Sequence, residues 1–176
     1  MKNQRGIKHE KMKYKIVSDF LDADAFGEIR DLVTNQDFPW RRRDHMAGDS
    51  DKMYFTYNFY NGMEVSSGLY KPHILPVLQK LEAVAPVEVR ANMSISELYE
   101  VSGWHCDYKL KCKSAILYLN GCDGGTELKI DEGVTTVFIK SEANKMLIFD
   151  ADVLHRGITS KREPVRYIIN FNYFTQ

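Results

Sequence analysis

The second half of the chain alternates apolar and polar residues over short segments, and this pattern does most to constrain the fold. In residues 87–95 the apolar side chains fall at every second position, which is the period of a half-buried strand. Turn sequences rich in Gly and Asp, such as residues 121–125 and 131–133, separate the segments that follow. We therefore expect further short strands over residues 97–100, 104–108, 114–120, 126–130, 134–140, 145–149, 153–158 and 165–174.

The first half of the chain predicts two helices and two strands. Asp22 can cap a helix over residues 23–34, in which apolar residues recur on one side. Residues 73–84 also have helical spacing, with a proline near the start. Residues 14–17 and the alternating aromatic segment 54–60 are typical of strands. Two helices followed by a run of short antiparallel strands indicate an α+β fold with a β-sandwich or jelly roll.

The domain organisation that we expect is simple. The chain has 176 residues, 44% of them hydrophobic, which is enough for one domain with a sizeable core. No linker composition interrupts residues 14–176, so we expect a single domain there, preceded by a flexible N-terminal arm at residues 1–13.

Composition also narrows the partners and the compartment. Lys and Arg total 24, as do Asp and Glu, so the formal net charge is zero and no overall field favours nucleic acid or an anionic membrane. No apolar run has membrane-spanning length, and the N-terminal residues lack the apolar core of a secretion signal. The three cysteines, an odd number without framework spacing, are expected to be free thiols. We expect a soluble, cytoplasmic protein; the sequence carries no signal of its oligomeric state.

The candidate site centres on His105 and Asp107. If the backbone there is extended, a spacing of two puts both side chains on one face. An imidazole nitrogen and a carboxylate oxygen are two of the three ligands of a facial metal triad. His155, which ends an apolar run, is the candidate third ligand, and Arg166 opens the last strand-like segment. Taken alone, a His-x-Asp tripeptide is also compatible with a surface or capping pair.

The surrounding motifs are more specific than the tripeptide. They are Ser-Ala-Ile-Leu-Tyr-Leu-Asn at residues 114–120, Gly-Gly-Thr-Glu-Leu at 124–128, Met-Leu-Ile-Phe-Asp at 146–150 and Arg-Tyr at 166–167. In their order and spacing, residues 87–174 resemble the Fe(II)/2-oxoglutarate-dependent dioxygenases. Within these, they are most similar to the prolyl 4-hydroxylase branch, which includes the hypoxia-sensing prolyl hydroxylases. The resemblance implies a double-stranded β-helix (jelly roll) core with N-terminal packing helices.

The resemblance also implies roles for individual residues. His105, Asp107 and His155 match the iron ligands, and Arg166 matches the residue that holds the distal carboxylate of 2-oxoglutarate. Tyr118 matches a tyrosine whose hydroxyl reaches the same carboxylate. A buried carboxylate needs a charged partner, and the planar fork of arginine supplies two parallel hydrogen bonds to it.

Three further positions follow from spacing and resemblance. Tyr99 resembles a tyrosine upstream of the first histidine ligand, although here it lies nearer to that histidine than in the family. Period two from Arg166 brings Asn170 and Asn172 to the same strand face, so Asn170 is a candidate contact to the cosubstrate. Asn172 falls where the hypoxia-sensing enzymes have a bulky aromatic residue, so we expect a different pocket here.

The function that the resemblance implies is hydroxylation of an aliphatic carbon, with a peptidyl proline as the first substrate expectation. The cofactors would be Fe(II), 2-oxoglutarate and O2, with ascorbate as the reductant. One alternative keeps this chemistry on a free amino acid, a small metabolite or a nucleobase. Another alternative is a non-catalytic jelly-roll binding module. The presence of all three proposed iron ligands and of Arg166 argues against it. Substrate contacts are expected in residues 40–62, where Arg41, Arg42 and Arg43 form either a solvated face or a contact to an acidic substrate.

Overall fold

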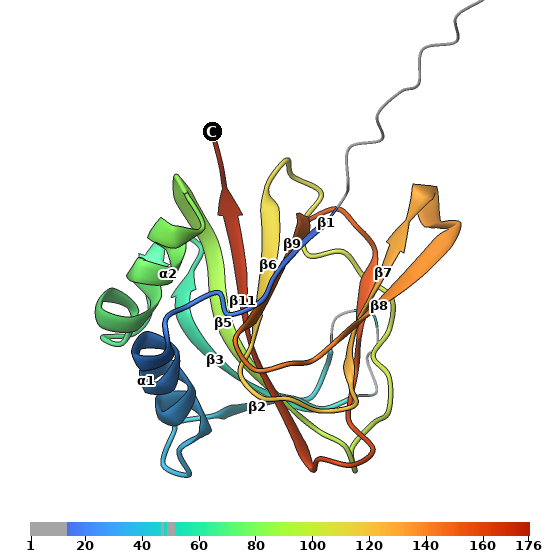
Figure 1. Cartoon of the computed structure of the whole chain (residues 1–176), viewed down its shortest axis with the longest axis horizontal. Coiled ribbons are helices and arrows are strands. Elements are labelled where there is room, and N and C mark those ends of the chain that lie inside the picture. The colour runs from blue at the N-terminus through green and yellow to red at the C-terminus, as the bar shows by residue number, and fades with distance from the viewer. Residues whose placement is uncertain (1–13, 47, 49–51) are drawn as a thin grey trace, which may run out of the picture.

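The computed structural model describes residues 14–46, 48 and 52–176, and the expected N-terminal arm at 1–13 lies outside these residues. Two antiparallel sheets face one another, and helices cover the outer face of the larger one (Figure 1). Along the large sheet the strands are ordered β1 (Tyr14–Val17), β9 (Lys145–Asp150), β6 (Lys113–Tyr118), β11 (Val165–Phe174), β5 (Ala85–Ile95), β3 (Tyr54–Asn61) and β2 (Arg41–Arg43), with β4 (Glu64–Val65) paired to β3. The small sheet has the order β10 (His155–Ile158), β7 (Gly125–Ile130) and β8 (Thr135–Lys140). This mainly antiparallel, two-sheet arrangement is consistent with a jelly roll.

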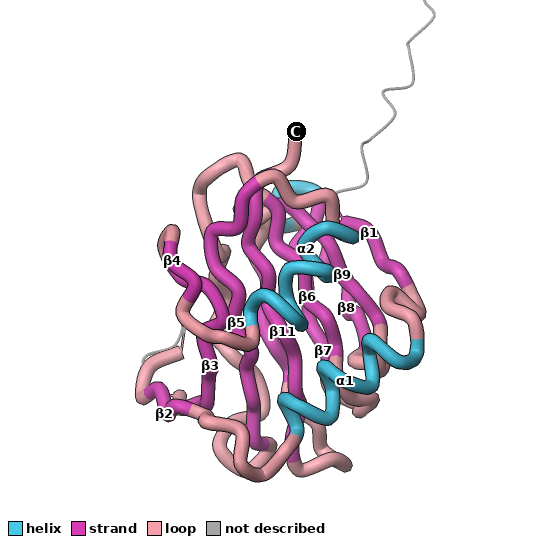
Figure 2. Tube along the Cα trace, turned by 90° about the vertical axis from the view of Figure 1, so that its left-hand side faces the viewer, coloured by secondary structure: helices cyan, strands magenta, loops and turns pink. Residues whose placement is uncertain are grey.

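The helices lie across the large sheet (Figure 2). Helix α1 (Ala23–Thr34) begins as predicted, because the Asp22 side chain accepts a hydrogen bond from the backbone N–H of Ala25 at 2.9 Å. The second predicted helix, at residues 73–84, differs from the prediction: a π-helical turn (Tyr70–Ile74) leads into a short α2 (Leu75–Lys80). Helix α2 ends early because Glu82 adopts a positive φ of 56°, which a right-handed helix cannot accommodate. No helix in the described part of the chain is both long and apolar enough to cross a membrane.

Alternation along the strands divides the interior into two apolar clusters. On β11, Ile169, Phe171 and Tyr173 face the helices and pack with residues such as Val33 and Ile74. Ile168 faces the small sheet, where it joins a cluster of residues from both sheets: Ile116, Tyr118, Leu128, Ile139, Leu147, Phe149 and Val153. Because successive side chains of a strand point to opposite faces, the same alternation turns the polar residues of β11 toward the space between the sheets.

Most predicted strands of the second half are confirmed, but two are wrong. Residues 97–100 form a turn, and residues 104–108 are irregular apart from an isolated bridge between His105 and His155. The reason for the second error is a close backbone approach: a Cβ at Gly103 would overlap the carbonyl of Gly48. The chain there is positioned by contacts with distant segments, through the approach to Gly48 and the bridge to His155.

We predict that Phe171→Ala lowers the free energy of unfolding by about 3–5 kcal/mol, because it removes a fully buried ring and leaves a cavity under the helices. Phe174→Ala is the matched control on the same strand, since Phe174 is 37% exposed, and should cost less than about 1 kcal/mol. Urea denaturation of both variants measures the difference, and equal losses would contradict the placement of the core.

Candidate metal and anion site

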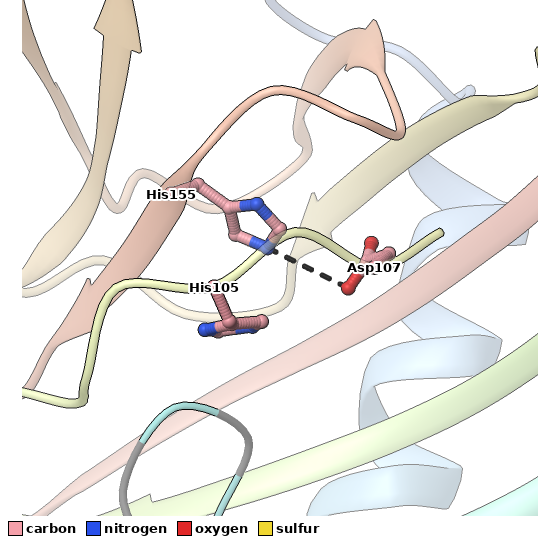
Figure 3. A group of neighbouring side chains, drawn as sticks. All are labelled: His105, Asp107 and His155. Carbon is pink, nitrogen blue, oxygen red and sulfur yellow. Dashed lines mark ion pairs between the residues drawn. The ribbon is translucent and has the colours of Figure 1, made fainter. Parts of the chain in front are cut away.

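His105, Asp107 and His155 converge between the two sheets from separate parts of the chain (Figure 3). The backbones of the two histidines form a β-bridge. The backbone N–H of His105 donates to the backbone carbonyl of His155 at 3.0 Å, and the backbone N–H of His155 donates to the carbonyl of His105 at 2.8 Å. One possible ligand atom from each residue of the triad lies within 4.8 Å of the others. Nε2 of His155 and Oδ1 of Asp107 are 3.6 Å apart.

Backbone carbonyls fix which nitrogen each imidazole presents. Nδ1 of His105 lies 3.0 Å from the carbonyl oxygen of Gly103, and Nδ1 of His155 lies 3.0 Å from that of Val153. A carbonyl can only accept, so each Nδ1 carries the proton and each Nε2 keeps its lone pair. Hydrogen bonding of the other ring nitrogen is the usual way in which proteins orient metal-binding histidines.

One oxygen of Asp107 is held by a group of polar side chains. Oδ2 accepts hydrogen bonds from Oγ of Ser114 at 2.6 Å, from Nδ2 of Asn172 at 2.8 Å and from Nδ2 of Asn170 at 3.3 Å. The other oxygen, Oδ1, is the one that faces His155. The polar side chains therefore hold the carboxylate through Oδ2 and leave Oδ1 free to bind a metal ion.

The electrostatics favour the metal-binding protonation states. Burial raises the pKa of Asp107, but the nearby His155 and the hydrogen bonds from Ser114 and Asn172 outweigh it and hold that pKa below its ordinary value. Burial lowers the pKa of His105, and the charge of His155 lowers it further. A neutral imidazole and an ionised carboxylate are the forms that bind a metal. Two imidazole nitrogens and one carboxylate oxygen fit a divalent iron site with open coordination positions.

Arg166 supplies a buried positive charge to the same cavity. It is 4% exposed, its Nη2 donates to Oγ1 of Thr126 at 3.0 Å, and its Cζ lies 5.4 Å from the centre of the Tyr118 ring. Its Nε is buried without a hydrogen-bond partner, and no Asp or Glu among the described residues forms an ion pair with it. A buried guanidinium without a counter-charge is costly, so this position fits the carboxylate of a bound diacid.

Of the other candidate residues, Tyr99 and Asn170 line the cavity, whereas Tyr118 lies behind its wall. Tyr99 lines the cavity and donates from its hydroxyl to Oγ of Ser94 at 2.6 Å, and Asn170 lines it while contacting Asp107. Tyr118 is fully buried, and its hydroxyl donates to Oγ1 of Thr126 at 2.8 Å. Tyr118 therefore reaches Arg166 through the threonine hydroxyl that both residues share.

Sequence reasoning missed Ser114 and Thr126 as members of the site. Ser114 is the cross-strand partner of Asn172, and the Ser114 hydroxyl accepts a hydrogen bond from Nδ2 of Asn172 at 2.8 Å. Period two from Arg166 already placed Asn172 on the cavity face, but it did not reveal the contact with Asp107. Ser114 and Asn172 become neighbours through the register between β6 and β11. This register cannot be predicted from the sequence of one strand alone.

Comparison with known proteins shows the fold. No protein-family model and no curated protein sequence matches the chain. Among solved structures, a 2OG-Fe(II) oxygenase family oxidoreductase from Burkholderia pseudomallei is 13% identical, with a TM-score of 0.71 over 93% of this chain and 86% of that one. A prolyl hydroxylase from Trichoplax adhaerens, in complex with a peptide fragment of the oxygen degradation domain of hypoxia inducible factor, is 16% identical, with a TM-score of 0.67 over 92% of this chain and 83% of that one.

A third similar structure, the epimerase SnoN in complex with Fe3+, alpha ketoglutarate and nogalamycin RO, is 12% identical, with a TM-score of 0.67 over 93% of this chain and 79% of that one. The chain therefore has the fold of the 2-oxoglutarate- and Fe(II)-dependent oxygenases, with prolyl hydroxylases among its structural neighbours. A fold of this kind carries different reactions in different proteins, so the activity has to be argued from the site.

We predict that His105→Ala abolishes stoichiometric binding of Fe(II) or Mn(II), because two remaining ligands cannot form the facial triad. His73→Ala, on the π-helical turn outside the site, is the matched control and should bind metal as the wild type does. Metal content after dialysis, measured by mass spectrometry, tests both variants. Unchanged content in His105→Ala would refute the ligand assignment.

We predict that Asn172→Ala weakens metal binding by about 10–100-fold, because Asp107 loses a hydrogen bond that orients it. Asn61→Ala, at the exposed end of β3, should leave the affinity unchanged. Titration calorimetry with Mn(II) measures both. Equal affinity in the two variants would show that Asp107 does not need Asn172 for its orientation.

Proposed function

We propose that this protein is an Fe(II)/2-oxoglutarate-dependent dioxygenase that hydroxylates an aliphatic carbon. The observation that carries the proposal is that one cavity is lined by a His-Asp-His triad and by a buried arginine that forms no ion pair within the described part of the chain. Either feature alone occurs for other reasons, but together they offer one site for a metal and one for the remote charge of a diacid. The oxygenase fold of the chain supports the same conclusion.

In this proposal each residue has a binding or orienting role. His105, Asp107 and His155 hold the iron, and Arg166 pairs with the distal carboxylate of 2-oxoglutarate. Tyr118 supports Arg166 through Thr126, and Tyr99 forms part of the wall. Iron and 2-oxoglutarate, when bound, supply an oxidant derived from O2 that can attack an unactivated C–H bond. The protein contributes orientation and exclusion of water, and we assign these roles to one domain over residues 14–176.

For the substrate, we propose peptidyl proline first, with ascorbate as the reductant that keeps the iron divalent. The support is the resemblance of the motifs and the peptide-bound prolyl hydroxylase among the structural neighbours. The same chemistry on a free amino acid or another small molecule is the alternative, and a neighbour bound to nogalamycin RO favours keeping it. A nucleobase in nucleic acid fits less well, because the chain has no net positive charge.

We predict that the purified protein, given Fe(II), ascorbate and 2-oxoglutarate, converts 2-oxoglutarate to succinate. Arg166→Gln should raise the KM for 2-oxoglutarate by about tenfold or more, because a charge-assisted hydrogen bond is worth about 1.5–3 kcal/mol. Arg166→Lys should have a KM for 2-oxoglutarate between those of the wild type and Arg166→Gln, because lysine keeps the positive charge but lacks the planar fork of arginine.

Arg162→Gln is the matched control, since Arg162 lies in the loop before β11 and is the nearest arginine in sequence that could replace Arg166. It should leave the KM unchanged, and the opposite ranking of the two variants would move the anchor to Arg162. No succinate from the wild type, with or without a panel of peptides and amino acids, would contradict catalysis.

A further inference from the structure

A second arginine, Arg90 on β5, lies in the wall of the same cavity. Along this strand Arg90, Asn92 and Ser94 line the cavity, whereas Val89 and Ala91 are buried in the core under the helices. The proposed roles for metal and 2-oxoglutarate do not use Arg90. A charged residue is costly in such a wall, so its presence calls for an explanation.

Strand pairing places Arg90 close to the triad and away from the Arg166 anchor. Arg90 is the cross-strand partner of Asn170, which donates to Asp107, and such partners share a face with Cβ atoms about 4.5–5.5 Å apart. Arg166 is instead paired with Ser94. Residues 90 and 94 are separated by about 13 Å along the strand, at about 3.3 Å per residue. The two guanidinium groups therefore start from different places on the sheet.

The hydrogen bonds of Arg90 leave one edge of its guanidinium available. Nη1 contacts Oε1 of Glu88 at 3.3 Å, a single and rather long ion pair. Nε is buried without a hydrogen-bond partner among the described residues. Nε and Nη2 form the edge that can give two parallel hydrogen bonds to a carboxylate. Glu88 therefore orients the side chain, while Nε on the edge suited to an anion has no hydrogen-bond partner among the described residues.

The side chain of Arg90 is 25% exposed, so solvent reaches it only in part. A neutral group filling the cavity beside Arg90 would remove the remaining water and leave a charged donor unpaired, which is unfavourable. A carboxylate at the same place would pair with it.

We propose that Arg90 binds a carboxylate of the prime substrate, so that the enzyme selects acids over neutral molecules of the same shape. This rests on the proposed dioxygenase function. The carboxylate has two possible sources: the α-carboxylate of a free amino acid, or an acidic side chain next to the reacting residue in a peptide. Both present the same chemistry to the guanidinium, and an experiment with matched probes distinguishes them.

The test measures binding to the full chain loaded with Mn(II) and 2-oxoglutarate. The probes are free L-amino acids against their α-amides, and terminally blocked prolyl peptides containing Asp against the same peptides with Asn. We expect at least one acid to bind about tenfold or more tightly than its neutral partner, the usual effect of a charge-assisted pair. The class of probe that shows this preference identifies the source of the carboxylate.

Variants assign the preference to Arg90. Arg90→Gln should remove the preference for the acid by weakening its binding about tenfold or more, and Arg90→Lys should retain part of it. The Kd for 2-oxoglutarate should change by less than about twofold, because Arg166 is assigned to that ligand. Arg30→Gln, on the exposed side of α1, is the matched control and should behave as the wild type. Thermal melting shows whether each variant is folded.

Two results would overturn the inference: no acid preferred by the wild type, or an Arg90→Gln variant that loses 2-oxoglutarate in place of the acid. Failure of the proposed function looks different. In that case the wild type neither binds 2-oxoglutarate in the presence of Mn(II) nor forms succinate with Fe(II). A wild type that forms succinate but ignores the charge of the probe contradicts the role of Arg90 alone.

Discussion

Strand β11 pairs with β5 on one side and with β6 on the other, and its register fixes which side chains face the cavity. The pairing with β6 sets Asn172 beside Ser114, and these two residues hold Asp107. The pairing with β5 sets Arg166 opposite Ser94. A slip of one residue would turn Arg166 toward the helices and bring apolar side chains into the cavity. The apolar packing under the helices therefore stabilises the same register that assembles the site.

The cavity concentrates polar groups that the apolar layers around it would exclude. Nε of Arg166, Nε of Arg90 and Oδ1 of Asn170 are buried and have no hydrogen-bond partner among the residues that the structure describes. Such groups lower the stability of a protein unless ligands satisfy them. Any ligand that binds the folded chain and not the unfolded chain stabilises it by mass action. If the proposed metal and diacid bind here, they would offset the cost of these unsatisfied groups.

Local patterns in the sequence were sufficient for most of the fold. The cap at Asp22 and the alternation of residues 165–174 depend on neighbours in the chain, and the structure has a helix and a strand there. Residues 104–108 were predicted wrongly because their backbone is set by the bridge to His155 and by the approach of Gly48 to Gly103. Those contacts join distant segments, so periodicity cannot reveal them.

In the site, too, some features follow from short stretches of sequence and others from contacts between distant segments. The spacing of His105 and Asp107 and the strand face of Arg166 could be predicted from short stretches of sequence. The strand face of Asn170 and Asn172 could be predicted in the same way, but their contacts with Asp107 and Ser114 could not, because these depend on how distant segments pair. Arg90 is the clearest example: residues 87–95 read only as an alternating strand, and it takes the pairing with Asn170 to bring this arginine beside the triad.

Two of the three consecutive arginines of β2, Arg41 and Arg42, point to opposite faces of the large sheet. Arg41 is the cross-strand partner of Thr56, whose hydroxyl contacts Asn92 of the cavity wall at 3.3 Å. Arg42 points to the opposite face, where it forms an exposed ion pair with Asp44 at 2.6 Å, a contact of little energetic weight. Arg41 itself lines a separate hollow at the edge of the sheet, together with Pro39 and Asn58. None of the three arginines lines the cavity that holds Arg90 and the triad, so their contact with an acidic substrate stays a prediction.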